Sequence, residues 1–133
     1  MSHNTPSVTV GIIARNEEKN IINTLEHIVK QDYPHDKIEI IIVDGNSTDK
    51  TREMAEEFLK KQNIRYSIYN EAREPADKDG CSFGHSFARN IVLRYMSTST
   101  DYIGWIDADC RADPSWLSTL VNTMETTIDN NVV

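Results

Sequence analysis

Nearly continuous runs of apolar and β-branched residues recur along the chain and predict strands. Residues 8–14 and 38–43 form the clearest runs, and their composition is typical of strands that are covered on both faces. Shorter runs at 66–69 and 102–107 predict two further strands. Between and after these runs, apolar residues recur at helical spacing and predict four amphipathic helices. Their apolar faces are, in chain order, Ile21, Ile22, Leu25, Ile28 and Val29; Met54, Ala55, Phe58 and Leu59; Phe87, Ala88, Ile91, Val92 and Tyr95; and Trp116, Leu117, Leu120 and Val121.

The predicted strands and helices alternate along the chain, with one long irregular segment at 70–84. This alternation predicts an α/β fold with a doubly wound, mostly parallel sheet and right-handed crossovers. At 133 residues, the chain is expected to form a single domain over 1–133. Within the loops, Asn16 is predicted to cap the first helix, and Ser47 or Thr48 is predicted to cap the second.

The composition narrows the possible classes of function. A net charge of −7 argues against a nucleic-acid partner, because no basic stripe is present to neutralise phosphates. The mean hydropathy of −0.52 and the lack of any apolar run near ~20 residues predict that the chain has no membrane segment. Because residues 1–6 lack the apolar region of a signal peptide, we expect a cytoplasmic location, with peripheral attachment to the inner face of the membrane as an alternative.

Two aspartates, Asp107 and Asp109, follow the last predicted strand at i, i+2 spacing. Side chains at this spacing point to the same side of an extended chain, and carboxylates are hard oxygen ligands for Mg²⁺ or Mn²⁺. A second Asp-x-Asp, at 77–79, lies in a polar stretch with no strand before it and is expected to be a solvated loop. The apolar run before Asp107 therefore favours a cation site there over the alternatives of a turn or a helix cap.

Polar residues follow three of the predicted strands: Arg15, Asn16 and Glu17 after the first, Asp44 and Asn46 after the second, and Asp107 and Asp109 after the last. Ligands of doubly wound sheets bind beyond the carboxyl ends of the strands, so these side chains are expected to converge on one site. Asp44 is suited to accept hydrogen bonds from a base or a ribose hydroxyl, with an Asx-turn or a helix cap as an equal alternative. The phosphate-loop patterns of ATPases and dinucleotide-binding proteins are absent from the sequence.

Several other polar side chains are weaker candidates. Arg89 is expected to reach a phosphate or to pair with a surface acid, and Arg73 and Lys78 to close over a diphosphate or remain solvated. His85 is a candidate acid or base, although a lone loop histidine is more often merely exposed. Cys110 is expected to be a small, half-buried thiol and not a nucleophile, since no partner base is evident.

Four blocks of the sequence resemble the nucleotide-sugar-binding half of a GT-A-fold glycosyltransferase of the family-2 type. They lie at 8–18 (VTVGIIARNEE), 41–51 (IIVDGNSTDKT), 84–90 (GHSFARN) and 106–109 (IDAD). The blocks are similar to that family's opening strand, its Val-Asp-Gly-Ser-Thr-Asp turn, its Gly-x-x-x-Ala-Arg-Asn helix and its Asp-x-Asp signature, in the same order. The resemblance spans 8–117 and implies the Rossmann-like half of a GT-A fold.

This resemblance implies a metal-dependent glycosyltransferase that transfers a sugar from a nucleotide-diphospho-sugar, UDP-linked, to an acceptor hydroxyl on a saccharide, lipid or protein. The residues that it places around the nucleotide sugar are Ala14, Arg15, Glu17, Asp44, Arg89 and Asp107. Asp44 would recognise the base, while Asp109, together with Asp107, would hold a divalent cation, Mn²⁺ or Mg²⁺.

The sequence departs from the family pattern in two ways. Arg15 stands where the family usually has Tyr, which bears on base stacking and on the identity of the donor. The family's acceptor region and catalytic base lie well beyond its Asp-x-Asp, so the base is expected beyond Val133 and the domain is expected to be truncated at its C-terminus. The alternatives are a non-catalytic nucleotide-sugar-binding or interaction module on the same half-fold, and a sugar-phosphate nucleotidyltransferase, whose Gly-rich basic loop is absent. A half-sheet that lacks its C-terminal part is also expected to expose apolar surface, which predicts association as a homo-oligomer.

Overall fold

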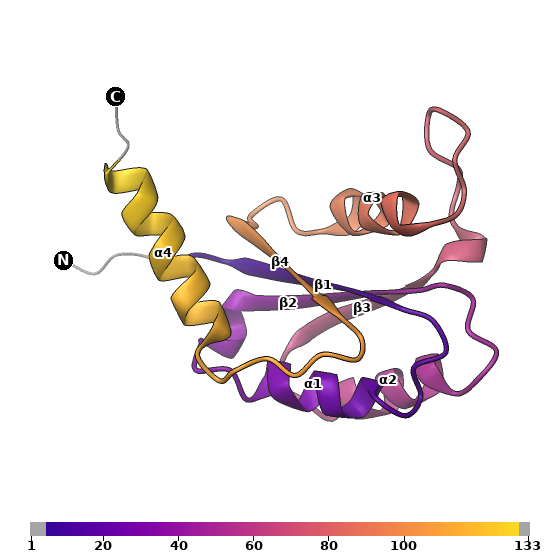
Figure 1. Ribbon diagram of the computed structural model, residues 1–133, viewed down its shortest axis with the longest axis horizontal. Helices are drawn as coiled ribbons and strands as arrows, with labels where there is room; N and C mark the ends of the chain where they lie inside the picture. The colour runs from indigo at the N-terminus through magenta and orange to yellow at the C-terminus, as the bar shows by residue number, and fades with distance from the viewer. Residues whose placement is uncertain (1–4, 131–133) are drawn as a thin grey trace.

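The computed structural model describes residues 5–130, with side chains through residue 128. Its four strands form one sheet of order β3-β2-β1-β4 in which every pairing is parallel (Figure 1). The strands are β1 (Val8–Ala14), β2 (Ile38–Asp44), β3 (Arg65–Asn70) and β4 (Tyr102–Asp107). The helices are α1 (Ile21–Val29), α2 (Thr51–Leu59), α3 (His85–Tyr95) and α4 (Trp116–Asn130), with short 3-10 turns at η1 (His35–Lys37) and η2 (Glu71–Arg73). The predicted alternation and the parallel sheet are confirmed.

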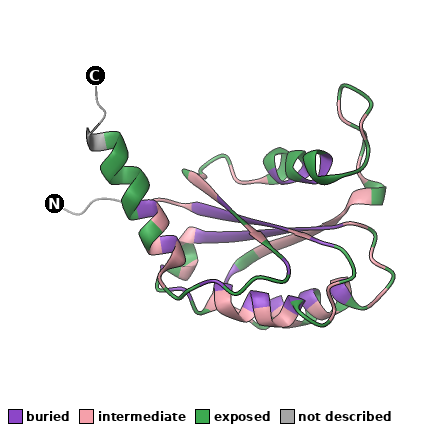
Figure 2. Cartoon of the chain, viewed as in Figure 1, coloured by how far each residue is buried: buried purple, intermediate pink, exposed green. Residues whose placement is uncertain are grey.

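Helices cover both faces of the sheet, as the prediction of a doubly wound fold required. Helices α1 and α2 lie against one face, and α3 lies against the other (Figure 1). The start of α4 joins the α1 side, where Leu117 and Val121 belong to the same apolar core as α1 and α2. The later turns of α4 extend away from the sheet and are exposed (Figure 2).

The two central strands are buried because they have helices on both sides. All of β2 is buried, and so is all of β1 except Ile13. The edge strands β3 and β4 are only partly covered, and the Trp105 side chain in β4 remains 38% exposed. This difference explains why the sequence shows continuous apolar runs for β1 and β2 and weaker ones for the edge strands.

Two apolar layers hold the helices to the sheet. On one face, Ile12 and Ile40 belong to a core that includes Leu25 of α1. On the other face, Ile41 and Phe87 belong to a smaller core between β2 and α3. Successive residues of a strand point to opposite faces, so Ile40 and Ile41 supply one side chain to each layer.

The order of the strands reverses beside β1. The chain adds β2 and β3 on one side of β1 and then returns to place β4 on the other side. Ile13 of β1 pairs with Asp107 of β4, and Ala14 pairs with Asp44 of β2, so the carboxyl ends of these strands lie at one edge. Ligands of doubly wound sheets bind at such a switch point, which here falls between β1 and β4.

The predicted helix caps are wrong. Helix α1 begins only at Ile21, with Asn20 at its N-cap, and α2 begins at Thr51 after Lys50. Asn16 lies four residues earlier than the cap, in the left-handed region with a φ of 52°, where an asparagine is better tolerated than most residues. Asn16 and Ser47 join the two loops to each other, and the side chain that bonds the first amide of α2 is Asp49, whose Oδ1 accepts from Thr51 at 3.0 Å.

The second Asp-x-Asp, at 77–79, is better anchored than the solvated loop that was predicted for it. Asp77 accepts a hydrogen bond from Asn90 at 2.8 Å and forms an ion pair with Arg94 at 3.3 Å. The ring of Tyr69 stacks on that of Tyr95 with centroids 4.2 Å apart. The contacts of Asp77 hold this segment to α3, and the Tyr69–Tyr95 stack joins β3 to α3. Among the described residues, no helix has the length and apolar character needed to cross a membrane.

Candidate functional site

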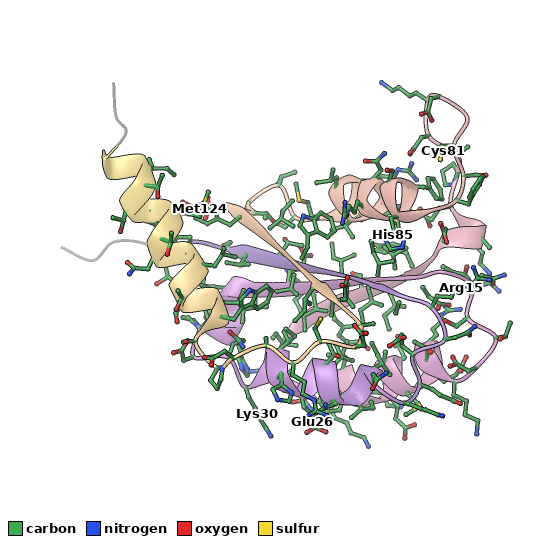
Figure 3. All side chains as sticks on the ribbon, in the orientation of Figure 1. Arg15, Glu26, Lys30, Cys81, His85 and Met124 are labelled. Carbon is green, nitrogen blue, oxygen red and sulfur yellow. The ribbon has the colours of Figure 1, made fainter. Side chains whose placement is uncertain are left out.

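A shallow pocket of about 320 Å³ lies at the switch point between β1 and β4. It combines the ends of these two strands with the start of α3, and its lining residues are Ile13, Arg15, Glu17, His85, Asp107, Ala108 and Asp109. Arg15 and His85 lie at the same end of the sheet, where β1 ends (Figure 3). The structure therefore brings together Arg15, Glu17 and the two aspartates, which the sequence placed in one site.

Three side chains at the end of β4 form a group suited to a cation. One ligand atom from each of Asp107, Asp109 and Cys110 lies within 4.8 Å of the other two, and all three residues are exposed. The two carboxylates supply hard oxygen atoms, which Mg²⁺ and Mn²⁺ prefer, and their exposure leaves room for water and phosphate oxygens. This donor set therefore fits the divalent cation that the sequence predicts.

The segment that carries these ligands is fixed by a buried hydroxyl of α1. Thr24, which is 1% exposed, donates from Oγ1 to the carbonyl oxygens of Ala108 and Cys110, with both distances 2.8 Å. The amide of Cys110 also donates to the carbonyl oxygen of Asp107 at 3.0 Å, which closes a tight turn. These bonds determine the backbone positions from which the ligands project.

Thr24 was missed in the sequence because it has no chemical signature of its own. It lies on the apolar face of α1, between Ile21 and Ile28, where a small polar residue could equally have been a filler of the core. The sequence does hold one signal, which is the position of Thr24 on the buried face of α1. A buried hydroxyl needs a hydrogen-bond partner, and the backbone carbonyls inside a helix are already bonded, so a partner from another segment is expected.

A dense set of hydrogen bonds joins the loops after β1 and β2. The amide of Gly45 donates to the carbonyl oxygen of Ala14 at 2.8 Å. The amide of Asn16 donates to Ser47 Oγ at 2.9 Å, and Asn16 Oδ1 accepts from the amide of Thr48 at 2.8 Å. This reciprocal pair fixes the backbone beside Arg15. The strand register alone would not determine it.

Asp44 forms an Asx-turn, which was one of the alternatives to its recognition of a base or a ribose hydroxyl. Its Oδ1 accepts from the amide of Ser47 at 3.2 Å and from the Ser47 hydroxyl at 2.5 Å. The residue is 3% exposed, and neither it nor Ala14 lines the pocket. The Asx-turn alternative therefore describes the contacts of one carboxylate oxygen, and base recognition by Asp44 stays a prediction.

Of the other polar candidates, one lines the pocket and three do not. His85, at the start of α3, lines it. Arg89, one helical turn further along, lies with its guanidinium 5.8 Å from the centroid of the Trp105 ring and does not line it. Arg73 and Lys78 are exposed and do not line the pocket either.

Cys110 differs from its expected half-buried state, because the structure leaves it exposed. Local desolvation and the charges of Asp109 and Asp107 nevertheless raise the pKa of its thiol above the usual value. Nucleophilic cysteines typically have a lowered pKa, which is the opposite direction, and the expectation that Cys110 is not catalytic stays a prediction.

Residues 9–133 match the family model described as Glycosyl transferase family 2. Glycosyltransferase AglE of Haloferax volcanii is 30% identical over 128 residues, which cover 96% of this chain and 38% of AglE. The probable glycosyltransferase YdaM of Bacillus subtilis is 46% identical over 98 residues, which cover 71% of this chain and 23% of YdaM. The chain thus spans well under half the length of these relatives.

Solved structures show the same architecture. The mannosyltransferase PcManGT from Pyrobaculum calidifontis, in complex with GDP-Man and Mn²⁺, is similar with a TM-score of 0.72 and 28% identity, over 92% of this chain and 32% of that chain. S. aureus TarS 1–349, in complex with UDP-GlcNAc, has a TM-score of 0.64 and 25% identity, over 93% of this chain and 31% of that chain. These likenesses confirm the predicted GT-A fold class.

Proposed function

The chain belongs to glycosyl transferase family 2, and on this premise we propose that it forms the donor site of a metal-dependent glycosyltransferase. The donor is a nucleotide-diphospho-sugar, UDP-linked, and the sugar is transferred to an acceptor hydroxyl. The observation that carries this proposal is the meeting of Asp107 and Asp109 with Arg15 and Glu17 in one pocket at the switch point of the sheet.

The charges that line the pocket support a requirement for a cation. Among the lining residues, Glu17, Asp107 and Asp109 carry carboxylates and only Arg15 carries a permanent positive charge. A diphosphate would add further negative charge to this site, and like charges at close range repel. A divalent cation on Asp107 and Asp109 reverses the sign of the local charge and makes diphosphate binding favourable.

Each side chain then has a defined task in donor binding. Asp109 and Asp107 hold the cation, which when bound supplies Lewis-acid neutralisation of the departing nucleoside diphosphate. Arg15 lies beside the nucleotide and is positioned to donate hydrogen bonds to a phosphate oxygen. Glu17 faces the same pocket, where its carboxylate accepts from hydroxyl groups of the ribose or sugar. None of these residues is assigned as the base that deprotonates the acceptor.

Asp44 is proposed to recognise the nucleobase of the donor. Its second carboxylate oxygen is suited to accept a hydrogen bond from an N–H of uracil. The solved relatives carry different donors, GDP-Man in PcManGT and UDP-GlcNAc in TarS. Guanine therefore has to be compared directly with uracil in the test.

Calorimetric titration of this chain with UDP and with GDP, each with and without Mn²⁺, tests the proposal. We expect UDP to bind only when Mn²⁺ is present and GDP to bind more weakly. Asp109→Asn should weaken UDP binding in Mn²⁺ by at least about tenfold, since it removes a charged ligand of the cation. The matched control is Asp79→Asn in the second Asp-x-Asp, which lies outside the pocket and should leave binding unchanged. Equal losses in the two variants, or UDP binding that does not respond to Mn²⁺, would contradict the metal site.

A further inference from the structure

We propose that Cys110 is a third protein ligand of the cation held by Asp107 and Asp109, and that it gives the site a preference for thiophilic divalent cations over Mg²⁺. This inference rests on the proposed donor site and extends it to the choice of metal. The group of three ligand atoms that lie within 4.8 Å of one another includes the Cys110 sulfur on equal terms with the two carboxylates.

The separation of the sulfur from its neighbouring carboxylate is close to that of two ligands on one ion. Cys110 Sγ lies 3.8 Å from Asp109 Oδ1. With metal–oxygen distances near ~2.1 Å and metal–sulfur distances near ~2.3 Å, two ligands of one ion are roughly 3.1 to 3.6 Å apart, depending on the coordination angle. A small rotation of the side chains is enough to complete this arrangement.

Hydrogen bonds fix the backbone of the turn that carries Cys110, which directly follows the pocket residues Asp107, Ala108 and Asp109. The Cys110 amide is bonded to the Asp107 carbonyl, and Thr24 binds the carbonyl oxygens on either side of Asp109. The three ligand-bearing positions are thus fixed relative to one another before any ion binds. An exposed thiol on a fixed turn loses little further conformational freedom when it coordinates a metal.

The chemistry of sulfur determines the preference. A thiolate is a soft ligand that favours zinc and similar ions, whereas Mg²⁺ takes oxygen ligands and keeps much of its water. On binding, the thiol proton leaves to solvent as the sulfur–metal bond forms, and no atom changes its oxidation state.

Titration with Cd²⁺, followed by the ultraviolet charge-transfer absorption of thiolate-bound cadmium, tests the inference directly. The chain has two cysteines, so Cys110→Ser and Cys81→Ser form a matched pair. We expect the absorption band in the wild type and in Cys81→Ser and its loss in Cys110→Ser, with Cd²⁺ affinity lower by at least about tenfold and Mg²⁺ affinity unchanged. A band that survives in Cys110→Ser, or no band in the wild type, would overturn the assignment.

A parallel titration of the same samples with UDP and Mn²⁺ separates this inference from the proposed function. If Mn²⁺-dependent UDP binding is present and no Cys110-dependent band forms, the third ligand is wrong and the donor site stands. If the band forms and is lost in Asp109→Asn, but UDP does not bind, the metal ligands are right and the donor-site proposal is wrong. The absence of both signals overturns both.

Discussion

The indole ring of Trp105 lies against the backbone of Gly11 on the neighbouring strand. A Cβ atom built on Gly11 would come within 2.5 Å of Trp105 Cζ3, so only a residue without a side chain allows this contact. The same ring carries the guanidinium of Arg89 at 5.8 Å from its centroid. A glycine in the middle of a buried strand thus makes room for a side chain that connects the sheet to α3.

We expect Gly11→Ala to destabilise the fold because the added methyl group collides with a rigid ring. Overpacking of this kind costs roughly 1–3 kcal/mol, and the partial exposure of Trp105 lets the ring move away and places the cost in the lower half of this range. Chemical denaturation of the two proteins measures the difference in the free energy of unfolding.

A double mutant shows whether the ring is the cause. If the collision with Trp105 accounts for the loss, Gly11→Ala should cost much less in a Trp105→Ala background than in the wild type. Equal costs in both backgrounds would place the effect of the alanine elsewhere in the strand.

Removal of the Thr24 hydroxyl should loosen the turn that carries the aspartates. Thr24→Val keeps the shape of the side chain but leaves the carbonyl oxygens of Ala108 and Cys110 without this donor. An unsatisfied buried polar group costs about 1–3 kcal/mol, so we expect a loss of stability in this range together with weaker Mn²⁺ affinity. Denaturation and metal titration measure the two effects.

Thr24→Ser is the matched control, because it keeps the hydroxyl and removes only a methyl group. It should retain metal affinity close to that of the wild type. If valine and serine reduce the metal affinity equally, packing of the methyl group and not the hydrogen bonds would explain the loss.

A tyrosine at the start of β4 gives the fold a pH dependence in the alkaline range. The Tyr102 hydroxyl donates to the Glu125 carboxylate of α4, and this bond raises the pKa of Tyr102 to about 12. Because the folded protein holds the proton more tightly than the unfolded chain, the stabilisation is complete below the ordinary pKa of 10.0 and is lost as the pH rises toward about 12.

Glu125→Gln removes the charge responsible and should return the pKa of Tyr102 toward 10.0. Ultraviolet titration of tyrosinate formation, with a Tyr102→Phe variant subtracted to isolate this residue, follows the shift. Superimposable titration curves for the wild type and Glu125→Gln would show that the carboxylate is not the cause.

The parts of the fold that follow from burial could be predicted from the sequence. Strand β1 was predicted with the bounds observed, because a strand covered on both faces is apolar at nearly every position. The helix starts could not be predicted in the same way. Asn16 and Ser47 have the side chains of helix caps, but they bond to each other's loops across 31 positions of sequence, a tertiary contact that local patterns do not encode.

In the candidate site, too, the residues that strand topology places could be predicted, and those that depend on tertiary contacts could not. The i, i+2 spacing of Asp107 and Asp109 after an apolar strand was sufficient to place them at the strand end, since parallel topology brings such ends together. The position of Thr24 on the buried face of α1 indicates that its hydroxyl needs a partner, but the partners could not be identified, because they are backbone carbonyls 84 and 86 positions away. Arg89 lies over the Trp105 ring, a tertiary contact that the sequence does not encode, and its proposed contact with the nucleotide sugar stays a prediction.

The final prediction separates the two roles left open for Asp44. One carboxylate oxygen closes the turn with Ser47, and the proposed function assigns the other to the base. Ser47→Ala removes the hydroxyl that donates to Asp44 and accepts from the amide of Asn16, so it should reduce stability by about 1–3 kcal/mol and lower UDP affinity less than Asp44→Asn does. Asp44→Asn keeps an oxygen for the turn but loses the charge, and a hydrogen bond to a charged group contributes about 1.5–3 kcal/mol. We therefore expect UDP affinity to fall by at least about tenfold in Asp44→Asn, measured by calorimetry in Mn²⁺. If Asp44→Asn instead binds UDP as the wild type does and only unfolds more easily, Asp44 is a turn residue and the base is recognised elsewhere.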